Sequence, residues 1–191
     1  MQPMLDSPFR RLVALLSTGL CAGAATAQAC PADSAAPAGT LLSVLVPDRP
    51  ALRLDRGQID ALPRTELVSR RTVGAAASAP AVEQQTRYAG WLLRDLALRA
   101  LGGGAAAERG LRGVVFEAVA TDNYRAYFSW GELFNHAAAE QVLVIGAVDG
   151  QLLGNDQGPL ALRALADQRP GPRHVRNLCA LVLRPMTGAA K

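Results

Sequence analysis

The chain has 191 residues, of which 50% are hydrophobic and 19% charged, and this balance is typical of a globular domain rather than a disordered or fibrous protein. Its formal net charge is +4, and Lys191 is the single lysine among its 20 basic residues. Because the arginines are scattered along the chain, we expect no nucleic-acid partner. One domain is expected at this length.

The N-terminal segment has the pattern of a secretory signal peptide. Two arginines precede an apolar stretch over residues 12–25, which is too short to span a bilayer comfortably, and small residues before position 30 fit cleavage after Ala29. We therefore expect residues 1–29 to be a signal peptide and the mature protein to be periplasmic or secreted, without a membrane-spanning segment. Lipidation of Cys30 is the competing interpretation, but the residues before it lack the usual leucine.

Two cysteines remain after this cleavage, Cys30 and Cys179. An oxidising compartment favours a disulfide between them, which would close nearly the whole chain and stabilise it by ~4–5 kcal/mol in the chain-entropy model. The alternative is a buried thiol at Cys179 and a loose tail at Cys30, and both interpretations stay open. With only His136 and His174 as histidines, we expect no structural zinc site.

Small and proline-rich residues over 30–40 are typical of a flexible lead-in, which is followed by a single domain over residues 41–186 and a tail at 187–191. Asp55 is a candidate N-cap for a short helix that ends at Pro63. A low-complexity connection covers 74–82. Apolar or alternating runs predict strands at 41–47, 51–54, 65–73 and, as a polar edge strand, 83–89.

The second half of the chain contains the clearest helix, predicted over 91–101 and ended by three glycines. A second helix is predicted over 130–139, because Ser129 and Glu132 have the spacing of a capping box. Further strands are predicted at 112–121, 124–128, 141–148 (central in its sheet) and in the C-terminal apolar run that begins near Leu178. Many short strands with a few short helices predict an α+β domain.

No local motif for a nucleophile elbow, a zinc protease or a phosphate-binding loop is present in the sequence. His136 lies four residues from both Glu132 and Glu140, and we interpret this trio as a solvated surface rather than a ligand set. We therefore expect no catalytic residue and no metal site.

The C-terminal loop around residues 168–176 concentrates basic side chains, among them Arg173, His174 and Arg176. Arginine presents a planar fork of donors that suits a phosphate, a carboxylate or the edge of a heterocycle. The alternative is a solvated basic loop. Trp91 and Tyr124 could stack on a planar ligand, or they could belong to the core.

Four segments, taken in order, resemble the molybdopterin-binding domain of the sulfite oxidase superfamily. They are YAGWLLRDL (88–96), VVFEAVATDNYRAYFSWGEL (114–133), the stretch from VLVIGAVDGQLL to GPLAL (142–162) and PRHVRNLCALVL (172–183). The resemblance covers roughly residues 50–184 and implies a sulfite-oxidase-like mixed β domain with a few short helices.

The departures from the family pattern concern the metal. In the family, a cysteine thiolate binds molybdenum at the end of the strand that corresponds to 65–73. Here that strand offers Arg70, Arg71 and Thr72, with Thr72 nearest the expected position, and a neutral hydroxyl is a poor replacement for a soft thiolate. The histidine of the family's His-Gly segment is replaced by Gln157. The resemblance therefore implies a retained pocket without the protein's anchor for the metal.

Our leading hypothesis is a non-catalytic pterin-binding or pterin-sensing module, with a pterin or molybdopterin-like ligand and no metal. The resemblance implies an inner-membrane sensor protein that controls cyclic-di-GMP as a candidate partner. A molybdenum-cofactor-dependent oxidoreductase is the alternative, and a ligand-free interaction domain is a third interpretation. The expected ligand-binding residues are Thr72, Trp91, Asp122, Tyr124, Arg173, His174 and Arg176.

Overall fold

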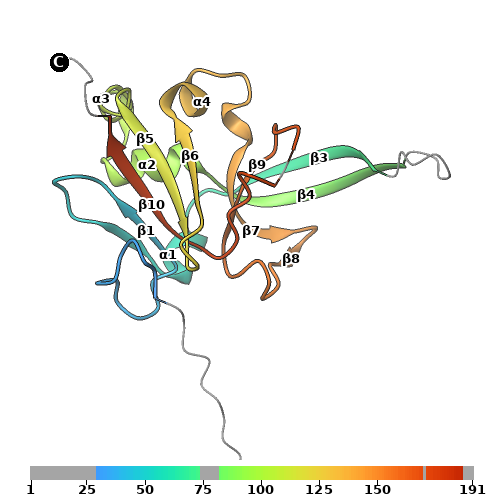
Figure 1. Ribbon diagram of the computed structural model, residues 1–191, viewed down its shortest axis with the longest axis horizontal. Helices are drawn as coiled ribbons and strands as arrows, with labels where there is room; N and C mark the ends of the chain where they lie inside the picture. Colours follow the sequence, from blue (N-terminus) through green and yellow to red (C-terminus); the bar gives the residue numbers. More distant parts are fainter. Residues whose placement is uncertain (1–28, 74–81, 170, 187–191) are drawn as a thin grey trace, which may run out of the picture.

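The computed structural model describes residues 29–73, 82–169 and 171–186. These residues form two five-stranded sheets and a few short helices (Figure 1), which confirms the predicted α+β class. The predicted signal peptide, low-complexity connection and tail lie outside the described residues, except for residues 29 and 82 at their borders. Within the described ranges, no helix has the length and apolar character that crossing a bilayer requires.

The first sheet lies in the body of the molecule (Figure 1). Neighbouring strands in it are antiparallel, except that its first and last strands in the sequence lie side by side in parallel. Both ends of the domain are thereby brought into the same sheet. The strand order is β2 (Leu52–Leu54), β1 (Leu42–Leu45), β10 (Leu178–Pro185), β5 (Val114–Ala120) and β6 (Arg125–Ser129).

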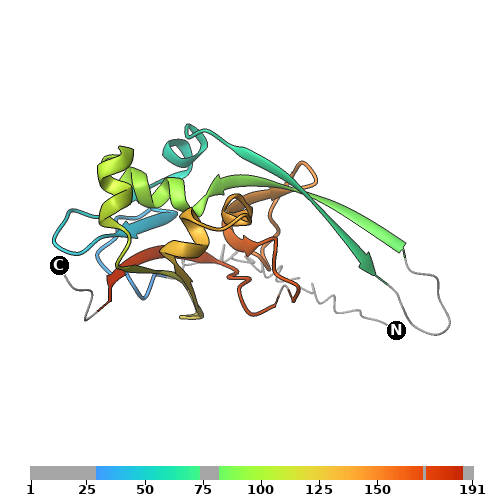
Figure 2. The ribbon, with the colours of Figure 1, turned by 90° about the horizontal axis from the view of Figure 1, so that it is seen from above.

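The second sheet contains the longest strands, and all its pairs are antiparallel. Its order is β3 (Thr65–Val73), β4 (Val82–Leu92), β7 (Val142–Val148) and β8 (Gln151–Leu152), and β9 (Ala161–Ala164) also pairs with β7. The outer parts of β3 and β4 project from the body as a two-stranded ribbon (Figure 1, Figure 2).

The strand predicted at 83–89 is present, but the edge position predicted for it was wrong where it reaches β7. That segment belongs to β4, which lies between β3 and β7. Its polar half runs along the projecting ribbon, whereas its apolar end pairs with β7 in the body, and β3 takes the edge position. Gly90 permits this pairing, because a Cβ atom there would lie 2.0 Å from the carbonyl oxygen of Val144.

The helices are short, and two of the predicted ones differ in extent. The predicted helix 91–101 begins later, because Trp91 and Leu92 complete β4, and the predicted helix 130–139 divides into a helix and a 3₁₀ turn. The helix after the three glycines was not predicted. The bounds are α1 (Arg56–Asp60, capped by Asp55), α2 (Leu93–Ala100), α3 (Gly104–Gly110), α4 (Trp130–Phe134) and the 3₁₀ helix η1 (Ala139–Gln141).

The second sheet buries both of its faces to different degrees. Its inner face joins the main core between the two sheets, where Trp91 and Val144 are fully buried. Its outer face carries a smaller apolar cluster around Leu143, Ile145 and Ala161. Partly buried side chains, including Tyr88, pack against this outer cluster. Strand alternation thus gives the second sheet an outer face that has an apolar surface and is accessible to solvent.

The N-terminal segment 30–40, expected as a flexible lead-in, is attached to the first sheet. Cys30 forms a disulfide with Cys179, so the structure contains the first of the two arrangements left open above. The buried carboxylate of Asp33 accepts hydrogen bonds from Ser43 Oγ at 2.7 Å and from Arg53 Nε at 2.8 Å. The segment is therefore held at three strands of the sheet.

Candidate functional site

Four basic side chains gather near the outer face of the second sheet, and we call them the basic cluster. They are Arg71, Arg163, His174 and Arg176. Arg163 comes from β9, where its neighbours Leu162 and Ala164 turn to the main core, so alternation directs Arg163 to the outer face. Its guanidinium carbon lies 5.7 Å from the centroid of the Tyr88 ring.

Two nitrogen atoms of the basic cluster are buried without a hydrogen-bond partner among the described residues. They are Nε of Arg163 and Nε2 of His174. Leaving a buried polar atom unsatisfied costs about 1–3 kcal/mol, so native proteins rarely do so without a reason. A polar ligand that reaches both nitrogens would remove this cost.

The electrostatics of the cluster follow from burial and from like charges. Burial lowers the pKa of Arg163, and the charges of Arg71 and Arg176 lower it further, although an arginine stays charged at neutral pH. Burial, helped by the charges of Arg163 and Arg176, lowers the pKa of His174 to about 4. The cluster therefore presents positive guanidinium donors beside a neutral imidazole, which offers one donor and one acceptor nitrogen.

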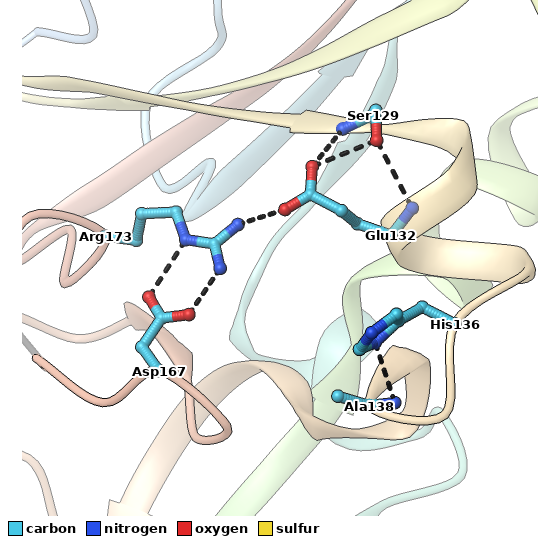
Figure 3. Close-up of polar contacts among 6 residues, drawn as sticks. All are labelled: Ser129, Glu132, His136, Ala138, Asp167 and Arg173. Carbon is cyan, nitrogen blue, oxygen red and sulfur yellow. Dashed lines mark hydrogen bonds and ion pairs between the residues drawn. The ribbon is translucent and has the colours of Figure 1, made fainter.

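Next to His174 in the chain, Arg173 lies between two carboxylates (Figure 3). It binds Asp167 through two nitrogens, with Nε 2.9 Å from Oδ2, and it binds Glu132 through a third. Its guanidinium carbon also lies 4.9 Å from the centroid of the Phe128 ring. The hydrogen bonds to Asp167 and then to Glu132 raise the pKa of Arg173. We call Glu132, Asp167 and Arg173 the Arg173 clamp.

Glu132 has a second role in this clamp. Its Oε2 atom accepts a hydrogen bond from the backbone N–H of Ser129 at 2.8 Å, and the Ser129 hydroxyl accepts one from the Glu132 N–H, which completes the capping box of α4 (Figure 3). Burial raises the pKa of Glu132, but the hydrogen bonds from Ser129 and Arg173 outweigh it and the pKa is lowered overall. The clamp thus ties the loop to the start of α4.

The structure has one hollow at the Arg173 clamp and another along β3. A pocket of about 200 Å³ is lined by the three clamp residues and by His136, whose Nδ1 accepts a hydrogen bond from the Ala138 N–H at 3.1 Å. A groove of about 430 Å³ follows the edge of β3 from Leu67 to Arg70 and faces η1. In the part of the chain that the structure describes, no group of three histidine, cysteine or carboxylate side chains is placed to hold a metal ion.

The residues predicted from sequence fall into three places. His174 and Arg176 belong to the basic cluster, and Arg173 belongs to the clamp. Tyr124 contacts the loop that carries these residues, where its hydroxyl donates to the carbonyl oxygen of Pro172 at 2.7 Å. Asp122 is next to it and accepts a hydrogen bond from the Tyr124 backbone N–H at 2.9 Å.

The other two predicted residues lie apart from the basic cluster. Trp91 is 2% exposed in the main core, and the guanidinium carbon of Arg64 lies 5.1 Å from its ring centroid. Thr72 is exposed and follows Arg71 on β3, so the two side chains face opposite sides of the strand. Neither is in contact with His174 among the interactions of the described residues.

Sequence reasoning missed Arg71, Arg163 and Tyr88. The signal for Arg163 was a lone arginine inside the apolar run of residues 160–165, where an unpaired charge is unusual. Arg71 and Tyr88 gave no comparable signal. Each comes near Arg163 only because β3 pairs with β4, β4 pairs with β7 and β7 pairs with β9.

A molybdenum centre anchored by a protein thiolate does not fit the donor atoms present. β3 carries no cysteine, and the two cysteines in the described ranges, Cys30 and Cys179, are bonded to each other. Soft metals of this kind prefer thiolate ligands. The basic cluster instead suits an anionic or heteroaromatic organic group.

The structure is similar to that of the sulfane dehydrogenase SoxCD from Paracoccus pantotrophus, with a TM-score of 0.55 and 14% sequence identity. The match covers 78% of this chain and 39% of that chain, so the chain spans less than half the length of this relative. At such low identity the likeness shows the fold alone. No family model matches the chain. No curated protein matches it either.

Proposed function

We propose that the protein binds a pterin at the basic cluster and acts as a non-catalytic binding or sensing module. The observation that carries this proposal is the pair of buried, unpartnered nitrogens, Arg163 Nε and His174 Nε2. The likeness to SoxCD, a molybdenum enzyme, supports a fold of that kind only coarsely, and a pterin-like ligand is consistent with it.

The chemistry of a pterin matches the groups that the cluster offers. A pterin is flat, and one edge of its ring alternates hydrogen-bond acceptors with donors. The guanidinium groups of Arg163 and Arg176 supply donors for the acceptors, and the neutral His174 accepts from a ring N–H. The apolar surface around Tyr88 suits the flat faces of the pterin ring. A few convergent polar groups on an apolar surface are typical of small-molecule sites.

The remaining parts of the proposal concern the metal, the compartment and the partner. The ligand of this proposal is a pterin without a protein-bound metal, and the disulfide between Cys30 and Cys179 is consistent with it. The N-terminal sequence supports export to the periplasm after cleavage near Ala29. Signalling to an inner-membrane sensor protein is the expected role of the bound state.

Binding is tested by fluorescence titration with neopterin and with neopterin monophosphate, using the exported protein. Arg163→Ala is expected to weaken binding by tenfold or more, since a hydrogen bond to a charged group contributes about 1.5–3 kcal/mol. Arg169→Ala is the matched control, because Arg169 is an exposed arginine on the neighbouring loop. Equal affinity in both variants would remove Arg163 from the site. Mass spectrometry of molecules released on denaturation identifies the natural ligand.

The likeness to a sulfane dehydrogenase favours a second candidate, an oxidoreductase that uses a molybdenum cofactor whose own dithiolene supplies every sulfur ligand. Metal analysis separates the two candidates. Stoichiometric molybdenum in protein purified from its native compartment would favour the enzyme, whereas a released metal-free pterin would favour the binding module.

A further inference from the structure

The loop between β9 and β10 carries residues of both the clamp and the basic cluster. We propose that Arg173 is a positioning residue of the ligand site, which holds this loop in place so that His174 and Arg71 face the ligand, and that Arg173 itself makes no contact with the ligand. This inference rests on the proposed function for its ligand-binding part only.

The donors of Arg173 are committed to the protein. Nε and one terminal nitrogen bind Asp167, and the other terminal nitrogen binds Glu132 (Figure 3). Such two-pronged pairing with a carboxylate fixes orientation as well as distance. A ligand that took over these donors would have to break ion pairs that are partly shielded from water, since 16% of the Asp167 side chain is exposed.

The clamp acts on Arg71 through Asp167. The carbonyl oxygen of Asp167 accepts a hydrogen bond from Nη2 of Arg71 at 3.5 Å. Because Arg173 binds the side chain of the same residue, it sets the position of the carbonyl group that anchors Arg71. Arg173 thus supports the position of Arg71 through one long hydrogen bond.

The clamp acts on His174 through the chain. On one side of His174, Val175 forms a two-bond bridge with Leu162, with N–O distances of 2.8 and 3.1 Å. On the other side, Arg173 is held by the clamp. His174 is therefore fixed between two anchors, and its half-buried ring stays near Arg163.

The first test needs no ligand. The chain has two histidines, so the imidazole signals of His174 and His136 are resolved by NMR during a pH titration. Burial and the charges of Arg163 and Arg176, opposed by Asp156, set the pKa of His174 at about 4. Arg173 is not among these groups. If Arg173→Ala releases the loop, exposure of the ring raises this pKa toward its ordinary value of 6.5.

The variants are chosen to separate positioning from direct contact and from loss of folding. Arg173→Lys keeps the charge but loses the two-pronged pairing, so the pKa of His174 should rise less in this variant than in Arg173→Ala. Asp167→Asn weakens the clamp without touching Arg173 and should shift the pKa of His174 in the same direction. Arg169→Ala should leave it unchanged, and His136 reports any general opening of the fold.

The second test measures affinity for neopterin monophosphate in the same variants. We expect about tenfold weaker binding in Arg173→Ala and Asp167→Asn, in step with the rise in the pKa of His174. Weaker binding with an unmoved His174 pKa would mean that Arg173 contacts the ligand, and it would overturn the inference. An unmoved pKa in both clamp variants would overturn it as well. A shifted pKa in a protein that binds no pterin would support the clamp and refute the proposed function.

Discussion

His174 shows how a single residue links the stability of the protein to its site. Its imidazole is half-buried next to guanidinium groups, which favours the neutral ring. In the unfolded chain the ring titrates near its ordinary pKa of 6.5, whereas in the folded protein the pKa is about 4. Between these values the unfolded state binds a proton that the folded state does not. Protonation therefore opposes folding in this interval.

The free energy of unfolding should consequently be constant above pH 6.5 and should decrease as the pH falls from 6.5 toward 4. Asp33, Glu117 and Glu132 have lowered pKa values in the folded protein. The stability that each carboxylate contributes is therefore lost only when the pH falls below its ordinary pKa, which is 3.8 for Asp33 and 4.5 for the two glutamates. Urea unfolding at pH 5, 6 and 7 measures the slope. His174→Gln should flatten it and His136→Gln should not, and a slope that survives in His174→Gln would contradict the assignment.

At the scale of elements, sequence patterns predicted strands well where apolar runs are bounded by turn residues. The strand predicted at 65–73 is β3, with the same first and last residues. Asp55 and Ser129 cap the N-termini of α1 and α4, as predicted. The errors came where tertiary pairing overrides local pattern. Trp91 and Leu92 fit a helix by spacing, but they extend β4 because β7 offers hydrogen bonds and the core takes the Trp91 ring.

The same reason explains which part of the site could be predicted. His174 and Arg176 stand in a conspicuously basic stretch, so composition alone drew attention to them. The charge of Arg71 acts on Arg163 only because β3, β4, β7 and β9 lie in one sheet, and no local signal encodes that order. Composition likewise cannot distinguish Arg173, whose donors are committed to carboxylates, from its neighbours.

The pairing of β4 with β7 gives a prediction at this scale. Gly90→Ala places a Cβ atom 2.0 Å from the carbonyl oxygen of Val144, which is backbone and cannot move without breaking the sheet. We expect a loss of at least about 3 kcal/mol of stability in thermal or urea unfolding. Gly57→Ala is the control, because its Cβ would meet its nearest atom at an ordinary 3.5 Å. Equal stability of the two variants would show that β4 and β7 can separate at no cost.

For the whole molecule, the disulfide joins the first described residues to a strand inside the first sheet. Cys30 and Cys179 are 149 residues apart in the sequence, so their bond closes a loop that contains nearly the whole domain. Asp33, Ser43 and Arg53 reinforce the same attachment. The N-terminal segment is thus part of the folded unit.

Removing this bond should lower the free energy of unfolding by about 4–5 kcal/mol in the chain-entropy model. Cys30→Ser with Cys179→Ser, compared with the oxidised wild type in a denaturant series, measures the loss. The wild type in reducing buffer should match the double variant, and thiol titration confirms that the bond is open. An unchanged unfolding midpoint with both thiols free would mean that the noncovalent contacts alone hold the segment.

The projecting ribbon has a mechanical consequence. β3 runs without interruption from the body, where Leu67 pairs with Tyr88 of β4, into the projecting part, where Arg71 pairs with Gln84 (Figure 1). A paired double strand resists bending along its length, so a twist of the ribbon moves Arg71 with it and reaches the carbonyl group of Asp167, which accepts a hydrogen bond from Arg71. The ribbon is therefore a lever arm that joins the body where β4 pairs with β7 and carries Arg71 of the basic cluster on its outer part.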